Sequence, residues 1–67
     1  MRSYMIFCRT SANLTVAEEA KYIGCSKQYI YEVERGKKDG SMQFWLKFAK
    51  LHMLSTVSAL SLAYKND

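Results

Sequence analysis

Apolar residues recur at helical spacing along most of the 67-residue chain, and short polar stretches separate the apolar runs. Segments of this kind cover residues 16–23 and 27–35, and a last one covers about residues 55–64. The clearest segment, residues 42–52, has the three-and-four spacing of a helix with one buried face, through Phe44, Trp45, Phe48, Ala49 and Leu51. The pattern therefore predicts a chain made mainly of short helices.

Capping residues mark where these helices begin and end. Thr15, with Glu18 three residues later, has the pattern of a capping box, in which each residue bonds the backbone of the other. Gly24 can end the same helix because glycine readily adopts the left-handed conformation. Serine N-caps precede the later helices, at Ser26, Ser41 and Ser55.

The first apolar run, Tyr4–Cys8, is too short for its periodicity to separate a strand from a buried helix. No second strand candidate exists in the sequence to pair with it, so we expect a helix, followed by a turn at residues 11–13. The predicted fold is all-α: one domain over residues 1–67, built as a compact bundle of about five short helices.

Two of the predicted helices meet at the three-residue junction Ile23-Gly24-Cys25. Ala20 is small where the second helix must cross closely, and Gly24 permits the sharp turn. Cys25, Ile30 and Val33 lie where such a pair of helices buries apolar contacts. Each position has its own physical reason, so residues 15–35 are expected to form a helix-turn-helix.

Over about residues 9–60, the sequence resembles the lambda-repressor-like, or Cro-type, helix-turn-helix domains. The resemblance is carried by Leu14-Thr15, Ala20, Gly24, Ser26, Ile30, Glu34-Arg35-Gly36-Lys37, Ser41-Met42 and Leu46-Lys47-Phe48-Ala49-Lys50. It implies a five-helix DNA-binding domain that acts as a homodimeric transcriptional regulator of phage or bacterial type. It also implies an ion pair between Arg9 and Glu34 that ties the first helix to the end of the recognition helix.

The chain departs from this family pattern at four positions. Glu19 and His52 each stand where a leucine is usual. We expect either a slightly rotated helix around Glu19 or a Glu19 that faces solvent or an interface, and a different course at the end of the fourth helix near His52. Val16 replaces a phosphate-binding glutamine, and Gly40 stands where proline is common.

By this resemblance, the residues that face the DNA bases are Lys27, Gln28, Tyr31 and Glu32. Their chemistry fits the role, because glutamine pairs with adenine, lysine donates to guanine and glutamate accepts from cytosine. The residues expected to bind phosphates are Ser26, Tyr29, Arg35, Lys37, Lys38 and Ser41. Tyr29 could instead be a core aromatic residue, and a lysine pair in a loop is often only solvated surface.

The composition indicates an anionic partner and argues against a zinc site and a catalytic site. The net charge is +4, from ten Lys and Arg against six Asp and Glu, which fits nucleic acid. Cys8, Cys25 and His52 supply too few ligands for a structural zinc site, and nothing orients a Cys–His pair for catalysis. We expect no cofactor, no metal, no membrane contact and no enzymatic activity, with a cytoplasmic location at the nucleoid.

The sequence thus predicts a small Cro-like repressor, of phage or mobile-element type, that binds a palindromic operator in double-stranded DNA as a homodimer. The dimer surface is expected at the end of the fourth helix and the C-terminal helix, within residues 44–64. Val57, Leu60 and Tyr64 share a face of that last helix, about residues 55–64, and Met1–Phe7 is the competing surface. One alternative is a protein-interaction module, antitoxin-like or anti-repressor, with a regulatory protein partner. Another is an excisionase-type architectural protein, which would need strands after the helix-turn-helix.

Overall fold

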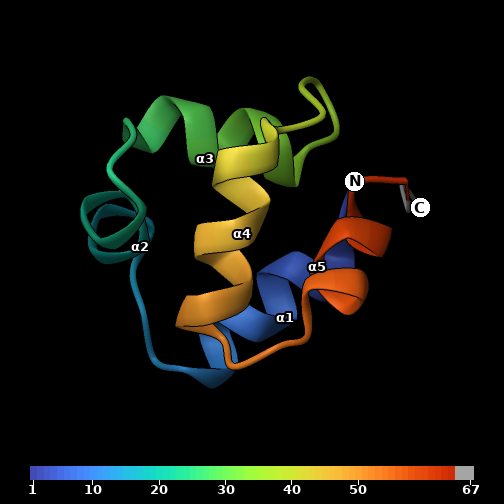
Figure 1. Cartoon of the computed structure of the whole chain (residues 1–67). Coiled ribbons are helices and arrows are strands. Elements are labelled where there is room, and N and C mark those ends of the chain that lie inside the picture. The colour runs from blue at the N-terminus through green and yellow to red at the C-terminus, as the bar shows by residue number, and fades with distance from the viewer. Residues whose placement is uncertain (65–67) are drawn as a thin grey trace.

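The computed structural model describes residues 1–64, which form five helices and no strand (Figure 1). The helices are α1 (Ser3–Ser11), α2 (Val16–Ile23), α3 (Lys27–Glu34), α4 (Met42–Leu51) and α5 (Thr56–Leu62). The prediction of an all-α bundle of five short helices is therefore confirmed. The first apolar run is a helix, and Asn13 after it has the left-handed backbone expected of that turn, with φ of 57°.

The caps predicted from the sequence are all present. The hydroxyl of Thr15 accepts from the Glu18 N–H at 3.1 Å, and the Thr15 N–H donates to Glu18 Oε1 at 2.9 Å. That backbone hydrogen bond lowers the pKa of Glu18 below its usual range. The hydroxyls of Ser26, Ser41 and Ser55 each accept from the N–H three residues later. Local capping thus fixes where four of the five helices begin.

The core is built around α4, which crosses the middle of the molecule with α2, α3 and α5 around it (Figure 1). Trp45 and Phe48 from α4 are almost completely buried, and their rings meet edge to face with centroids 5.4 Å apart. Phe44 and Ala49 are also buried on α4, and the other helices contribute Met5, Val16, Ala20, Ile23, Ile30, Val33, Ala59 and Leu62.

The buried face of α5 differs from the face expected from the sequence, which was that of Val57, Leu60 and Tyr64. Ala59 and Leu62 are the buried residues of α5, and Leu60 is half-buried. Val57 is 79% exposed and Tyr64 is 89% exposed. Two of the three residues on the expected apolar face of this helix therefore lie in solvent.

A matched pair of glycine substitutions tests the packing at the start of α4. Gly24 and Gly40 both have positive φ, 88° and 82°, so an alanine at either position is strained by about 1–2 kcal/mol. A Cβ at Gly40 would lie 2.7 Å from Trp45 Nε1, whereas the nearest atom at Gly24 is Lys47 Nζ at 3.7 Å. We expect Gly40→Ala to lower the free energy of unfolding by about 1–3 kcal/mol more than Gly24→Ala does, in urea titrations. Equal losses would contradict this packing.

Candidate nucleic-acid interface

The helix-turn-helix forms at the predicted junction. Gly24 ends α2 in the left-handed conformation, and its N–H donates to the Ala20 carbonyl at 2.8 Å. Lys47 from α4 donates its Nζ hydrogen to the Ile23 carbonyl at 3.1 Å, so α4 braces the turn from the side. Ser26 then begins α3. The angle between α2 and α3 is thus held by a glycine turn, a serine cap and a contact from a third helix.

The helix α3 has one buried face and one exposed face. Ile30 and Val33 are completely buried and anchor the helix on the core. Lys27, Gln28 and Tyr31 are exposed, and Glu32 is half-buried. Three of the four residues expected to face bases therefore point to solvent, and the fourth lies at the edge.

Glu32 already has partners within the protein. Its Oε1 lies 3.4 Å from Lys38 Nζ, and its backbone carbonyl accepts from the N–H groups of Lys37 and Lys38. The Lys38 ammonium also lies 5.6 Å from the centre of the Tyr29 ring. A predicted base-reading residue and a predicted phosphate-binding residue thus form an ion pair with each other. An exposed pair of this kind is weak and can open when a phosphate offers a stronger partner.

Tyr29 supports the beginning of α4. The ring is half-buried and meets Phe44 edge to face, with centroids 5.5 Å apart. Its hydroxyl accepts a hydrogen bond from the Ser41 N–H at 3.1 Å. The Tyr29 ring therefore packs on the core, as the alternative interpretation expected. Its hydroxyl lies at the surface beside Ser41.

The 36–41 loop, which carries Lys37 and Lys38, is fixed from inside the molecule. Trp45 Nε1 donates to the Asp39 carbonyl at 2.8 Å, and Arg2 Nη1 donates to the Lys38 carbonyl at 3.0 Å. The side chains of Lys37 and Lys38 stay exposed on this held backbone, and so does that of Arg35 at the end of α3. The loop presents a set of cations close to the end of α3.

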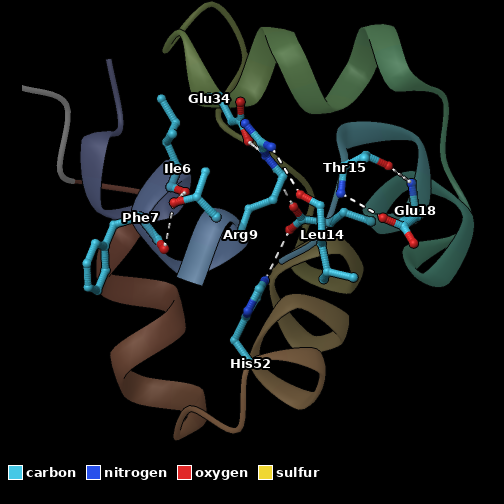
Figure 2. A network of polar contacts seen from close by, with 10 residues as sticks. Ile6, Phe7, Arg9, Leu14, Thr15, Glu18, Glu34 and His52 are labelled. Atoms are coloured by element: carbon cyan, nitrogen blue, oxygen red, sulfur yellow. Dashed lines mark hydrogen bonds and ion pairs between the residues drawn. The ribbon is translucent and has the colours of Figure 1, made fainter. Parts of the chain in front are cut away.

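Arg9 joins three helices through two buried carboxylates (Figure 2). Its Nε donates to Glu34 Oε2 at 2.9 Å, which is the pair that the family resemblance implies. The same Nε lies 3.9 Å from Glu19 Oε2, and Nη1 donates to the Leu14 carbonyl at 3.2 Å. The contacts tie α1 to the first turn of α2 and to the last residue of α3.

The expectation that Glu19 faces solvent or an interface is wrong, because its side chain is completely buried. His52, which follows α4 as its C-cap, places Nε2 3.3 Å from Glu19 Oε1. The two residues that replace the usual leucines therefore meet each other inside the protein. Glu19 Oε2 has no hydrogen-bond partner among residues 1–64, so Arg9 and His52 are what stabilise this carboxylate.

Both cysteines lie within reach of this buried charge. Burial, and then the negative charge of Glu19, raise the pKa of the Cys8 thiol, and the same causes raise that of Cys25. Lys47 opposes the shift at Cys25. Raised values keep both thiols protonated near neutral pH, so neither has the thiolate character of a reactive cysteine.

Arg2 is a buried residue to which the sequence pattern assigned no role. Its side chain is 1% exposed, although it lies at the second position of a basic chain. No local pattern distinguishes it from a surface arginine, because the hydrogen-bond partners of its side chain lie more than 30 residues away. Glu19 and His52 did carry a signal, since each places a polar group in an apolar position.

A double substitution tests the buried pair. In His52→Leu, Glu19 loses the contact with His52 Nε2 and keeps only Arg9, at 3.9 Å, near its buried carboxylate, so we expect a loss of about 3–5 kcal/mol in unfolding free energy. Adding Glu19→Leu removes the stranded carboxylate, and the double variant should regain wild-type stability or exceed it by about 1–4 kcal/mol. Urea denaturation at pH 7 measures both. A double variant less stable than His52→Leu alone would contradict the pairing.

Comparison with known proteins gives one informative match. The chain is 38% identical over 50 residues to an uncharacterized HTH-type transcriptional regulator of Methanocaldococcus jannaschii, and the match covers 75% of this chain and 76% of that protein. No protein-family model matches the chain, and no solved structure does. No helix within residues 1–64 has the length and apolar character needed to cross a membrane. With the helix-turn-helix geometry, this match shows that the chain belongs to the HTH-type transcriptional regulators.

Proposed function

We propose that this protein regulates transcription by binding duplex DNA, with α3 in the major groove. The observation that carries the proposal is the division of α3 between a buried face, Ile30 and Val33, and an exposed face at its N-terminal half, Lys27 and Gln28. A recognition helix reads base edges with its N-terminal residues while its other face rests on the domain. Membership of the HTH-type regulators supports the same role.

Base reading is assigned to Lys27, Gln28, Tyr31 and Glu32. Gln28 can bond both polar atoms of an adenine edge, and Lys27 can donate to a guanine. Tyr31 can touch a thymine methyl group, and its ring also lies 5.6 Å from the Arg35 guanidinium carbon. Glu32 can accept from cytosine once Lys38 moves to a phosphate.

Phosphate binding is assigned to Ser26, Tyr29, Arg35, Lys37, Lys38 and Ser41. The two serine hydroxyls are used in helix caps, so we expect their contribution through the first N–H groups of α3 and α4. Arg35, Lys37 and Lys38 supply the positive charge at the other end of α3. A cytoplasmic location at the nucleoid follows from this function.

Selection from a random pool of duplex DNA tests the proposal, followed by titrations with two variants. Gln28→Ala should cost about 1–3 kcal/mol and relax the preference at one base pair. Lys37→Ala should weaken binding to all sequences alike and reduce the slope of log K against log salt by about 0.9. If the two variants behave identically, the division into base and phosphate contacts is wrong.

The two alternative functions make different predictions in the same experiment. The segment that an excisionase-type domain would use for strands is helical here, as α4 and α5, which disfavours that alternative. A protein-interaction module would retain no DNA from the pool even at low salt. The Glu32–Lys38 pair, which lowers the free positive charge beside α3, is the feature that favours this second candidate.

We further propose that the protein acts as a Cro-like repressor and binds a palindromic operator as a homodimer. Exposed Lys and Arg side chains of the described residues all lie between residues 21 and 50. The 51–64 segment contains no Lys, Arg, Asp or Glu, and the only charged residue of α1 is Arg9, which is paired inside. Two copies of a chain with charge +4 repel least when this uncharged side lies between them and the exposed Lys and Arg side chains point away.

The uncharged side is also apolar and grooved. Tyr4 and Phe7 of α1 are 53% and 60% exposed, and Met53 after α4 is 93% exposed. These residues line a groove of about 370 Å³ together with Leu51 and Leu54. The groove brings Tyr4 and Phe7 of the N-terminal surface beside the 51–54 segment that precedes α5, and an exposed apolar groove of this kind suits a second copy of the chain.

Sedimentation analysis tests this face. We expect Phe7→Ser combined with Met53→Ser to shift the monomer–dimer equilibrium towards monomer by at least tenfold, because it removes exposed apolar area from both copies. Tyr22→Ser is the matched control, since Tyr22 is 56% exposed but lies on α2, among the charged residues. Equal effects of the two changes, or a wild-type monomer at all concentrations, would contradict the proposed face.

A further inference from the structure

Arg2 has an unusual number of partners for a residue so close to a chain end. Its Nε donates to the Leu62 carbonyl at 2.9 Å, and Nη2 donates to the Ala63 carbonyl at 2.8 Å. Its Nη1 donates to the Val33 carbonyl at 2.7 Å and to the Lys38 carbonyl at 3.0 Å. Its guanidinium therefore connects the end of α5, the end of α3 and the 36–41 loop.

Two further contacts hold the guanidinium in place. Its central carbon lies 5.7 Å from the centre of the Trp45 ring, and Nη2 lies 3.6 Å from the exposed carboxylate of Asp39. The Arg2 backbone N–H also donates to the Glu34 carbonyl at 2.7 Å. Since the side chain is 1% exposed, it is held by packing as well as by hydrogen bonds.

Arg2 is one of the side chains that hold the backbone of the 36–41 loop, and it does so at Lys38. Trp45 is another: it bonds the next carbonyl, that of Asp39, and packs against Arg2. Their two donors meet consecutive carbonyls, so the loop turns its carbonyl oxygens inward at these residues. The lysine side chains of the same loop are exposed to solvent.

We propose that Arg2 is a positioning residue for phosphate binding: it sets the 36–41 loop so that Lys37 and Lys38 reach the DNA backbone. It does not touch DNA itself, because its charge is buried behind the loop. This inference rests on the proposed function, since it assigns a role within that same interface. Pre-ordering of the loop removes an entropic cost that the lysines would otherwise meet on binding.

Arg2→Met is the variant that tests this role, because methionine keeps apolar packing against Trp45 but removes all the donors. The Lys38 carbonyl then loses its tie to the interior, and the loop should open without global unfolding. Limited proteolysis of the free protein with trypsin measures this opening. We expect cleavage after Lys37 and Lys38 to rise at least tenfold relative to cleavage after Lys47 and Lys50, which lie within α4.

Two controls separate loop opening from a general loss of stability. Leu62→Ala destabilises the same helix end from the core side, and it should raise cleavage at all lysines alike. Arg2→Lys keeps the charge but not the planar fork, so it should restore the protection only in part. An Arg2→Met protein whose cleavage pattern matches that of Leu62→Ala would overturn the proposed hold on the loop.

The DNA measurement then tests the link to phosphate binding. Wild-type protein should show a steep salt dependence, and Arg2→Met should reduce the slope by about 0.9 for each phosphate that the two lysines no longer reach. In a Lys37→Ala/Lys38→Ala background, Arg2→Met should change the slope no further. A wild-type slope in Arg2→Met overturns this inference alone. A wild-type protein that binds no DNA overturns the proposed function, and this inference with it.

Discussion

The ion contacts of Arg9 are the constraint on which the arrangement of the first three helices depends. One guanidinium lies between Glu34, at the last residue of α3, and Glu19, in the first turn of α2. Burying these charges is costly unless their geometry is kept, so any shift of α1 relative to the helix-turn-helix leaves a carboxylate without its partner. A domain of this size has a small apolar core, so the loss of one of these contacts would remove a large share of its stability.

The helix α3 is anchored at both of its ends as well as along its buried face. At its beginning, Ser26 caps the helix, and Lys47 bonds the carbonyl of Ile23 just before the turn. At its end, Glu34 is held by Arg9, and its backbone carbonyl accepts from Arg2. The exposed side chains between these anchors are left free to adapt to a partner, while the backbone that carries them is fixed.

Local signals explain why much of this fold could be predicted from the sequence. The Thr15–Glu18 capping box and the left-handed Gly24 depend on neighbours within a few residues, so their residue types specify the helix ends. The contact between Glu19 and His52 could not be predicted in this way, although each is visible as a polar residue in an apolar position. They are 33 residues apart, and only the packing of α4 against α2 brings them to 3.3 Å. A single polar residue in a core position is most simply expected to turn outward, whereas two of them can satisfy each other inside.

The distribution of charge connects these internal contacts to the surface. Exposed charges gather between residues 18 and 50, while α1 and the 51–64 segment present an uncharged apolar surface. Arg2 lies between the charged region and the apolar surface. Its guanidinium bonds the Ala63 carbonyl after α5 and the Lys38 carbonyl in the 36–41 loop. One buried guanidinium thus holds both the chain just after α5 and the loop that carries Lys37 and Lys38.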